Sequence, residues 1–195
     1  MQEIILASNS PRRKQLLEQI NIPFSVLPAQ TELAPDESLP PAKAVANIAL
    51  GKARDVSLQL GTGGQQHLII AADTMVCLKN ELLGKPSNRE HAMEMLARLS
   101  GETHIVYTGL ALCLGEKVLV DTVSTQVSFR QLSKEEIISY VESGEPLDKA
   151  GAYGIQGCGA HFVSHIVGDF YNVVGLPLCR LWELLKEMGY HPIGG

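Results

Sequence analysis

The apolar positions at the start of the chain predict a buried strand that leads into a helix. Residues 4–7 are all apolar, which favours a strand inside the protein, and a turn of small polar residues follows. Ser10 then stands where a helix N-cap residue is expected, and Pro11 suits the first helical position, which needs no N–H group. Leu16, Leu17 and Ile20 supply the apolar face of this helix.

A long apolar stripe with one lysine on it marks a second helix. Residues 23–28 predict a short strand, and Pro41 begins the helix. The stripe consists of Val45, Ile48, Ala49, Val56 and Leu60. Lys52 occupies the position between Ala49 and Val56 on this stripe. A lysine there either extends its ammonium group along the apolar surface to solvent or faces a cleft, and the pattern leaves both open.

A nearly continuous apolar stretch ends in a carboxylate. Residues 67–72 predict a strand that is buried on both faces, with Asp73 and Thr74 at or near its end. A carboxylate after such a run is costly unless it is paired or binds a metal ion, and open α/β sheets bind ligands at the carboxyl ends of strands. Asp73 is therefore the strongest candidate for a catalytic residue. Its alternative role is to cap a turn, although residues 75–78 favour further strand.

The rest of the chain alternates helix signals with long strands. The elements expected after residue 78 are a hairpin turn at 79–81, a helix opened by a capping box of Ser87 and Glu90 and ended by Gly101, two long strands within 103–130 joined at 115–116, a helix opened by a capping box of Ser133 and Glu136 and ended by Gly144, a glycine-rich stretch at 144–160, two strands joined at 168–169, and a last helix from Pro177. This order predicts a mixed α/β fold with long antiparallel strands rather than alternating β-α-β units.

Composition narrows the class of protein. The chain has 195 residues, of which 45% are hydrophobic, which suits one domain, with room for two lobes, around a substantial core. Its net charge of −5 argues against binding a nucleic acid polymer by bulk electrostatics. We find no signal peptide and no apolar run of transmembrane length, which favours a cytoplasmic protein that does not bind a membrane. The cysteines are expected to be reduced residues of the core: Cys77, Cys113, Cys158 and Cys179.

Several catalytic motifs are missing from the sequence. There is no GxxxxGK[ST] phosphate-binding loop and no GxSxG nucleophile elbow, and the glycines near Tyr153 lack the spacing and flanking elements of a dinucleotide fingerprint. His161 and His165 lie in a stretch that favours strand, where a separation of four residues spans roughly 13 Å, too far for one metal ion. We therefore interpret both as structural or surface histidines.

Cations in the first turn of the first helix point to an anion. Arg12, Arg13 and Lys14 stand where the helix dipole disfavours positive charge, and a bound phosphate would reverse that cost. Guanidinium groups grip phosphate oxygens through two parallel hydrogen bonds. A solvated basic turn is the alternative interpretation of these residues.

Further cations and carboxylates extend the same chemistry. Lys52 and Lys85 would add contacts to phosphates, and Glu32 and Asp73 would hold a divalent cation through oxygen, as Mg²⁺ prefers. This inventory suits metal-assisted attack of water on a phosphoanhydride. The spacing of these residues does not by itself establish that they converge.

Five segments, in order and at fitting intervals, resemble one family. They are SNSPRR at 8–13, AADT at 71–74, GKP at 84–86, SGEPLDKAGAYGIQG at 143–157 and VGLP at 174–177. Together they resemble the Maf family of nucleoside triphosphate pyrophosphatases, also called septum-formation inhibitors, over essentially the whole chain. The first and fourth segments are specific to this family, whereas the GKP segment alone would be weak evidence for the resemblance.

This resemblance implies a fold, a reaction and an assembly. The fold would be a single Maf-like domain over residues 1–195, ITPase-like, with a mixed, largely antiparallel, elongated sheet flanked by helices and two lobes around a cleft. The reaction would be hydrolysis of a nucleoside triphosphate to the monophosphate and pyrophosphate with a divalent cation, Mg²⁺ or Mn²⁺. The protein would be a homodimer in the cytoplasm.

The resemblance also implies roles for individual residues. Asp73 would be the proton acceptor in catalysis. The residues that determine substrate choice would be Arg12, Thr74 and Gln156. Those that bind phosphate would be Ser8, Arg12, Arg13, Lys52 and Lys85. The metal ligands would be Glu32 and Asp73.

The DKAGAYGIQG segment is similar to the family branch that acts on dTTP and UTP, together with some modified pyrimidine nucleotides. The carboxamide of Gln156 offers a donor and an acceptor, which matches a uracil or thymine edge, although a guanine edge also has both. A pyrophosphatase that prefers 7-methyl-GTP therefore remains an alternative. Two others are a non-catalytic, nucleotide-sensing regulator of cell division and a phosphotransferase with the same grip on polyphosphate.

Overall fold

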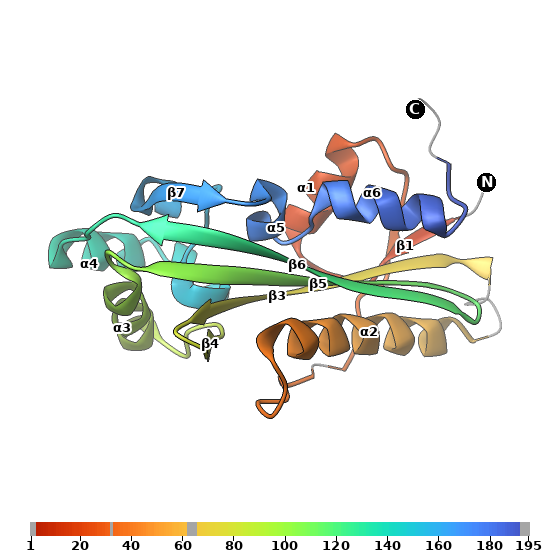
Figure 1. Ribbon diagram of the computed structural model, residues 1–195, viewed down its shortest axis with the longest axis horizontal. Helices are drawn as coiled ribbons and strands as arrows, with labels where there is room; N and C mark the ends of the chain where they lie inside the picture. The colour runs from red at the N-terminus through yellow and green to blue at the C-terminus, as the bar shows by residue number, and fades with distance from the viewer. Residues whose placement is uncertain (1–2, 32, 62–65, 192–195) are drawn as a thin grey trace. The chain divides into compact units, whose positions relative to one another are not determined.

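The computed structural model describes residues 3–31, 33–61 and 66–191 (Figure 1). The helices and strands up to residue 99 are β1 (Ile4–Leu6), α1 (Pro11–Gln19), β2 (Ser25–Val26), α2 (Pro41–Leu60), β3 (Leu68–Leu78), β4 (Glu81–Leu83) and α3 (Arg89–Leu99). After residue 99 come β5 (Thr103–Leu114), β6 (Lys117–Phe129), α4 (Lys134–Glu142), the short 3-10 helices η2 (Glu145–Asp148), η3 (Ala150–Ala152) and η4 (Cys158–Phe162), then β7 (Val163–Val167), α5 (Phe170–Val174) and α6 (Leu178–Glu187).

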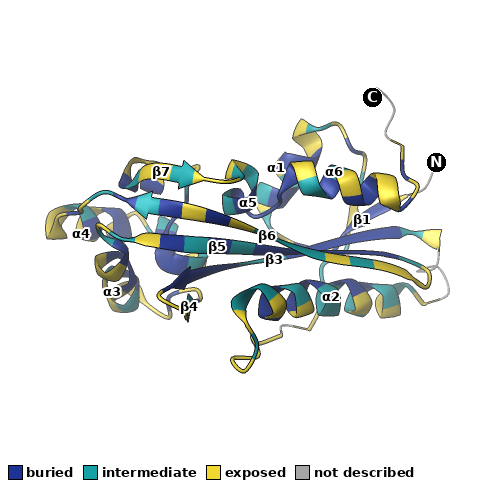
Figure 2. Cartoon of the chain, viewed as in Figure 1, coloured by how far each residue is buried: buried dark blue, intermediate teal, exposed yellow. Residues whose placement is uncertain are grey.

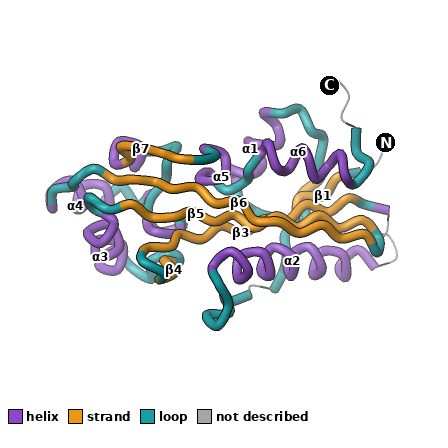
Figure 3. The backbone as a smooth tube through the Cα atoms, viewed as in Figure 1, coloured by secondary structure: helices purple, strands orange, loops and turns teal. Residues whose placement is uncertain are grey.

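All seven strands belong to one mixed sheet (Figure 3). The strand order is β2-β1-β3-β5-β6-β7, with β4 paired to β3. β1 pairs in parallel with β2 and β3, whereas β3 with β4 and β6 with β7 are antiparallel. β5 and β6 are neighbours joined only by Gly115 and Glu116, so they form the predicted hairpin. The predicted mixed α/β fold, with a sheet flanked by helices, is confirmed.

The chain divides into two compact units, each built from separate stretches of sequence. The first unit comprises residues 1–73, 108–123 and 175–195, and Figure 1 places α2 on one side of its strands and α6 on the other. Its α2-facing core joins small residues of the helix, such as Ala49 and Ala53, to Ile69 of β3. Figure 2 shows the buried stripe along α2 that makes this contact. Small helical residues let α2 approach the sheet closely.

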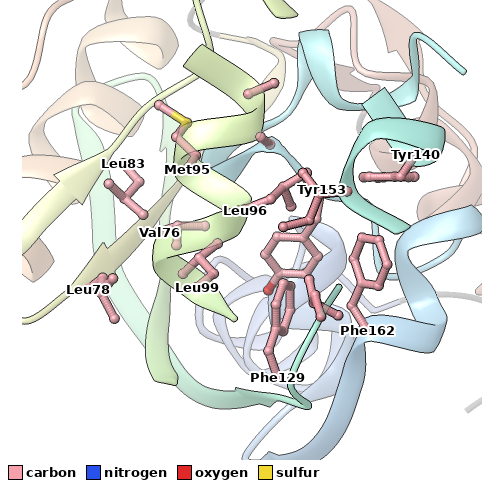
Figure 4. Packing of buried hydrophobic residues seen from close by; sticks show 14 of the residues in the cluster. Val76, Leu78, Leu83, Met95, Leu96, Leu99, Phe129, Tyr140, Tyr153 and Phe162 are labelled. Carbon is pink, nitrogen blue, oxygen red and sulfur yellow. The ribbon is translucent and has the colours of Figure 1, made fainter. Parts of the chain in front are cut away.

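The second unit comprises residues 74–107 and 124–174 and has a core rich in aromatic rings. Figure 4 shows Phe129, Tyr153 and Phe162 gathered beside Leu96 of α3. The rings of Phe129 and Tyr153 meet edge to face with centroids 4.8 Å apart. Such pairs stabilise a core beyond the area that they bury, by about 0.5–1.5 kcal/mol. This core holds the glycine-rich stretch against α3 and α4.

Helix starts in the second unit test the two predicted capping boxes. The box at Ser133 and Glu136 is confirmed, with both reciprocal hydrogen bonds present. The box predicted at residues 87–90 is wrong, because Asn88 is the N-cap residue of α3 and its side chain accepts a hydrogen bond from the N–H of His91 at 2.8 Å. The extended backbone of Asn88 allows this contact, so the helix begins one residue later than the predicted box implies.

The two strands predicted around residues 168–169 are only half confirmed. β7 is present, but the second segment is the short helix α5. A carboxylate oxygen of Asp169 accepts a hydrogen bond from the N–H of Tyr171 at 2.7 Å, a contact typical of a helix start. The backbone of Asp169 is also held by the Thr125 hydroxyl, which donates to its carbonyl at 3.0 Å. These local bonds outweigh the strand preference of the aromatic and β-branched residues that follow.

Two predictions drawn from composition can be compared with the structure. Cys77 and Cys113 are buried as expected, whereas Cys158 and Cys179 are exposed, so the prediction that all four lie in the core is wrong for these two. Cys158 follows the exposed residues Gln156 and Gly157, and Cys179 lies on the outward side of α6, which explains why both are exposed. Over the described ranges, no helix is both long enough and apolar enough to cross a membrane.

Candidate active site

Ser8 organises the turn between β1 and α1. Its buried hydroxyl accepts hydrogen bonds from the N–H of Ser10 and from Nη1 of Arg13, both at 3.2 Å. Ser10 is the N-cap residue and Pro11 begins α1, as predicted, but the Ser10 side chain makes no capping hydrogen bond. The short side chain of Ser8 therefore orders the turn in place of Ser10.

Arg13 turns inward from the first turn of α1. It is buried, and its Nε donates a hydrogen bond to the carbonyl oxygen of Gly175, 2.8 Å away, just before α6. Burial lowers the pKa of the guanidinium, while the Asp73 carboxylate acts against that shift and Arg12 adds to it. Arg12 and Lys14 on the same turn are half-buried. Arg13 thus fastens α1 to the segment before α6 and contributes positive charge near Asp73.

Asp73 lies in the middle of β3, so the prediction that it lies at or near the end of its strand is wrong, whereas the further strand favoured by residues 75–78 is present. The neighbouring strand supplies the missing strand end. Leu6, the last residue of β1, pairs in parallel with Ile70, and the N–H of Ala7 donates to the Ile70 carbonyl at 2.8 Å. The chain then leaves the sheet through the Ser8 turn, and Asp73 lies beyond the carboxyl end of its parallel neighbour. Ligands bind at the carboxyl ends of strands in open α/β sheets, and here the strand end next to Asp73 is that of β1.

Lys52 of α2 forms an ion pair with Asp73. Its Nζ lies 2.5 Å from Oδ1 of Asp73, and the two side chains are 21% and 18% exposed. The flanking stripe residues Ala49 and Val56 are fully buried. This contact argues against the first alternative for Lys52, because its ammonium group turns toward a carboxylate rather than to solvent. That the pair faces a cleft stays a prediction. A pair in this partly buried setting is screened less by salt than a pair on the surface.

Glu32, the predicted second metal ligand, lies outside the described residues. The residues just before it are fastened to α2 by Asp55, whose carboxylate accepts hydrogen bonds from the N–H of Gln30 at 2.6 Å and the hydroxyl of Thr31 at 3.1 Å. Asp55 lies three residues after Lys52, which places the two on the same side of the helix. This spacing was the sequence signal for Asp55, which our sequence analysis missed.

Thr74, Lys85 and Gln156 belong to the second unit. Thr74 is half-buried in β3, whereas Lys85, in the turn after β4, and Gln156, in the glycine-rich stretch, are exposed. The carbonyl oxygen of Gly84 accepts a hydrogen bond from the N–H of Gly151 at 3.0 Å. The turn that carries Lys85 is therefore bonded to the glycine-rich stretch.

The first unit brings part of the predicted site together. Ser8 is bonded to Arg13, Arg13 interacts electrostatically with Asp73 and Arg12, and Asp73 is paired with Lys52. The result is one carboxylate surrounded by cations, an arrangement suited to binding polyphosphate and to accepting a proton. Within the described ranges, no group of three His, Cys, Asp or Glu residues could hold a metal ion.

Comparisons with known proteins agree with the motifs. Residues 3–188 match the model of a family described as Maf-like protein. A dTTP/UTP pyrophosphatase of Caldicellulosiruptor saccharolyticus is 44% identical over 197 aligned positions, covering 100% of this chain and 99% of the relative. A dTTP/UTP pyrophosphatase of Bacillus anthracis is 48% identical and covers 96% of both chains. Among solved structures, the Staphylococcus aureus Ham1 protein aligns with a TM-score of 0.48 and 18% identity, covering 95% of this chain and 99% of its own.

Proposed function

The chain belongs to the Maf family, and on that premise we propose that it hydrolyses nucleoside triphosphates to the monophosphate and pyrophosphate. The preferred substrates are dTTP and UTP, with modified pyrimidine nucleotides as further candidates, because relatives of nearly the same length carry the name dTTP/UTP pyrophosphatase. The observation that carries the proposal is the Lys52–Asp73 pair, which supplies a carboxylate among cations. A carboxylate in this setting can accept a proton from water while the surrounding cations bind the negatively charged triphosphate.

Asp73 is the proposed proton acceptor. Water attacks the α-phosphorus, its proton passes to the Asp73 carboxylate, and the bond from that phosphorus to the bridging oxygen breaks with its electron pair going to pyrophosphate. Lys52 already contacts Oδ1 of Asp73 and, with three N–H donors, can also bind a phosphate oxygen. The same lysine thus orients the carboxylate and neutralises charge that develops on the phosphates.

The proposal assigns the remaining residues by the family resemblance. Ser8, Arg12 and Lys85 bind phosphate, and Arg12 also takes part in substrate choice with Thr74 and Gln156. Arg13 contributes positive charge from its buried position and holds Ser8. We include both compact units in one catalytic domain, because the family model spans residues 3–188 and so covers both.

The proposed cofactor is a divalent cation, Mg²⁺ or Mn²⁺. Mg²⁺ is commonly held by one or two carboxylates, water and substrate phosphates rather than by a full cage of protein ligands. Asp73 fits this role, since its Oδ2 accepts no hydrogen bond from the described residues; Glu32, the second ligand, lies outside those residues. When bound, the cation polarises the phosphoryl oxygens.

The family resemblance also supports proposals about assembly and place in the cell. We propose a homodimer that acts in the cytoplasm on free nucleotides. Sedimentation of the purified protein at several concentrations measures the assembly directly. A particle of monomer mass throughout the micromolar range would contradict the dimer without affecting the proposed reaction.

The test of the reaction is pyrophosphate release from dTTP, UTP, CTP, GTP and 7-methyl-GTP, each with Mg²⁺, with Mn²⁺ and with EDTA. Metal-dependent release from dTTP and UTP, lost in Asp73→Asn and kept in the control Glu116→Gln at the exposed β5–β6 turn, is the expected result. Preference for 7-methyl-GTP would move the protein to the sister branch. Binding without release would favour the regulator of cell division, and a need for an acceptor other than water would favour the phosphotransferase.

A further inference from the structure

Two side chains fasten the segment that carries Gln156 at both of its ends. The N–H of Gly154 donates a hydrogen bond to the hydroxyl oxygen of Tyr140 at 3.0 Å, and the N–H of Cys158 donates to Oε2 of Glu145 at 2.8 Å. The Tyr140 hydroxyl in turn donates to Oε1 of Glu145 at 2.9 Å. Residues 154–158 therefore form a loop whose two ends are bonded to one Tyr–Glu pair.

The ionisation states of this pair suit its hydrogen bonds. Burial acts to raise the pKa of Glu145, but the hydrogen bonds from Cys158 and Tyr140, together with Gly159 and the charge of Lys149, outweigh it and leave the pKa below its usual value. Burial raises the pKa of Tyr140, with Glu145 adding to the rise. At neutral pH the tyrosine is therefore a donor and the glutamate an acceptor. Lys149 adds a further contact by donating from Nζ to the Glu145 carbonyl oxygen at 2.6 Å.

The pair also approaches glycines in and next to the loop closely. A Cβ at Gly157 would lie 2.3 Å from Oε1 of Glu145, and a Cβ at Gly154 would lie 2.9 Å from the same oxygen. A Cβ at Gly159 would lie 2.8 Å from the hydroxyl oxygen of Tyr140. None of these glycines has a positive φ, so close approach of side chains, and not backbone conformation, excludes a side chain there. At Gly154 the Lys149 side chain adds to this, with its Cε 2.8 Å from the Cβ position.

Gln156 lies between the two anchored ends. It is exposed, and its carboxamide makes no hydrogen bond to the described residues, so both its donor and its acceptor are available to a ligand. We propose that Tyr140 and Glu145 are positioning residues that hold loop 154–158 so that the Gln156 carboxamide meets the base of the nucleotide. This inference rests on the proposed function. The pair acts on recognition of the base and leaves the chemistry at phosphorus unchanged.

The test compares Tyr140→Phe and Glu145→Gln with the control Glu142→Gln, the same change at an exposed position of α4. We measure kcat and KM for dTTP, UTP and CTP on proteins whose folding is checked by thermal unfolding. Each test variant should raise KM for dTTP on the order of tenfold, because it removes or weakens a hydrogen bond with a charged group, and should change kcat by less than about twofold. The ratio of kcat/KM for dTTP over CTP should fall in proportion.

These readouts separate the possible failures. A folded Tyr140→Phe and a folded Glu145→Gln with the wild-type selectivity ratio would overturn the positioning role while leaving the proposed function intact. A general loss of stability with unchanged selectivity in the remaining folded protein would assign the pair a structural role only. A wild-type protein that releases no pyrophosphate would overturn the proposed function and this inference with it.

A double-mutant cycle tests the same contact from the side of the loop. Gly157→Ala alone should raise KM, because its Cβ would meet Glu145 at 2.3 Å and shift the loop. Glu145→Ala removes the atoms that the new methyl group meets. The double variant should therefore bind dTTP no more weakly than Glu145→Ala alone. Effects that simply add would show that Gly157 and Glu145 act independently and would contradict the inference.

Discussion

The hydroxyl oxygen of Tyr153 lies 2.8 Å from Nε2 of His104 in the core of the second unit, although the two residues are 49 positions apart in the sequence. His104 is 1% exposed, and Phe129 packs against its ring edge to face with centroids 5.1 Å apart. Tyr153 directly follows the 3-10 helix η3, so this contact anchors the end of η3 to β5. A buried histidine with one polar partner is held in its neutral form.

Protonation of His104 should weaken the fold in acid. Burial lowers its pKa from 6.5 to about 4, so between these values the unfolded chain binds a proton that the folded protein does not. Stability from this residue is therefore full above pH 6.5 and is lost as the pH falls toward 4. Between pH 7 and 4.5 the loss should be about 2–3 kcal/mol, measured by urea unfolding. His104→Gln should flatten the profile, whereas His165→Gln, at an exposed site, should not.

Replacing Asp73 should lower turnover strongly without unfolding the protein. Asp73→Asn keeps the size of the side chain but removes the proton acceptor, and kcat should fall by about 10²–10⁴-fold. Single-turnover pyrophosphate release and thermal unfolding measure the two effects separately. Near-normal turnover in a folded Asp73→Asn variant would exclude Asp73 as the base.

Lys52→Met should act on binding and catalysis more than on stability. The change keeps the apolar stem that lies along α2 but removes the ammonium group paired with Asp73. KM for dTTP should rise on the order of tenfold. Lys43→Met, at an exposed position of the same helix, is the control. A large fall in melting temperature with activity preserved would instead make Lys52 a structural residue.

The same substitution should lower stability at Arg13 and weaken nucleotide binding at Arg12. Arg13→Met removes the donors to Gly175 and Ser8 from a buried position and should cost about 2–4 kcal/mol of stability. Arg12→Met affects a half-buried position and should change stability by less than about 1 kcal/mol while raising KM for nucleotide. Chemical unfolding and steady-state kinetics on both variants distinguish the two. Equal stability losses would contradict the assignment.

Removing Asp55 should release the residues before Glu32. The Asp55 carboxylate accepts hydrogen bonds from the backbone N–H groups of Gln30 and Thr31. In Asp55→Ala those amides should exchange with solvent at least tenfold faster, because loss of one hydrogen bond to a charged group corresponds to about a tenfold change in the opening equilibrium. Amide exchange followed by NMR reads each position. Amides inside α2, such as that of Ala49, should keep their wild-type rates. Unchanged exchange at Gln30 would show that Asp55 does not hold this segment.

Short-range signals in the sequence predicted most of the elements. Pro11, the Ser133–Glu136 box and the turn at 115–116 specify structure through neighbours within four residues, and each was confirmed. Errors arose where two local preferences competed. Asn88 reaches the helix N–H groups better than Ser87, and Asp169 starts a helix in a stretch whose composition favours strand.

The candidate site divides in the same way. Asp73 could be selected from sequence because a carboxylate after a buried strand is costly, but its partner Lys52 lies 21 positions away and had two open interpretations. Tyr140 and Glu145 were missed, since nothing local distinguishes a tyrosine that packs in the core from one that holds a loop. Contacts of this kind depend on how α4 and the glycine-rich stretch fold together.

The first unit is assembled from three separate stretches of chain, so it cannot fold completely until the last stretch has been synthesised. Arg13 finds one of its acceptors only when Gly175 has been made, 162 residues later. Until then the α1 turn carries a cation without that buried acceptor, although β1 can already pair with β2 and β3. Contacts at such separation form slowly. The turn proposed to grip phosphate is therefore among the earliest parts of the chain to be synthesised and among the last to be completed.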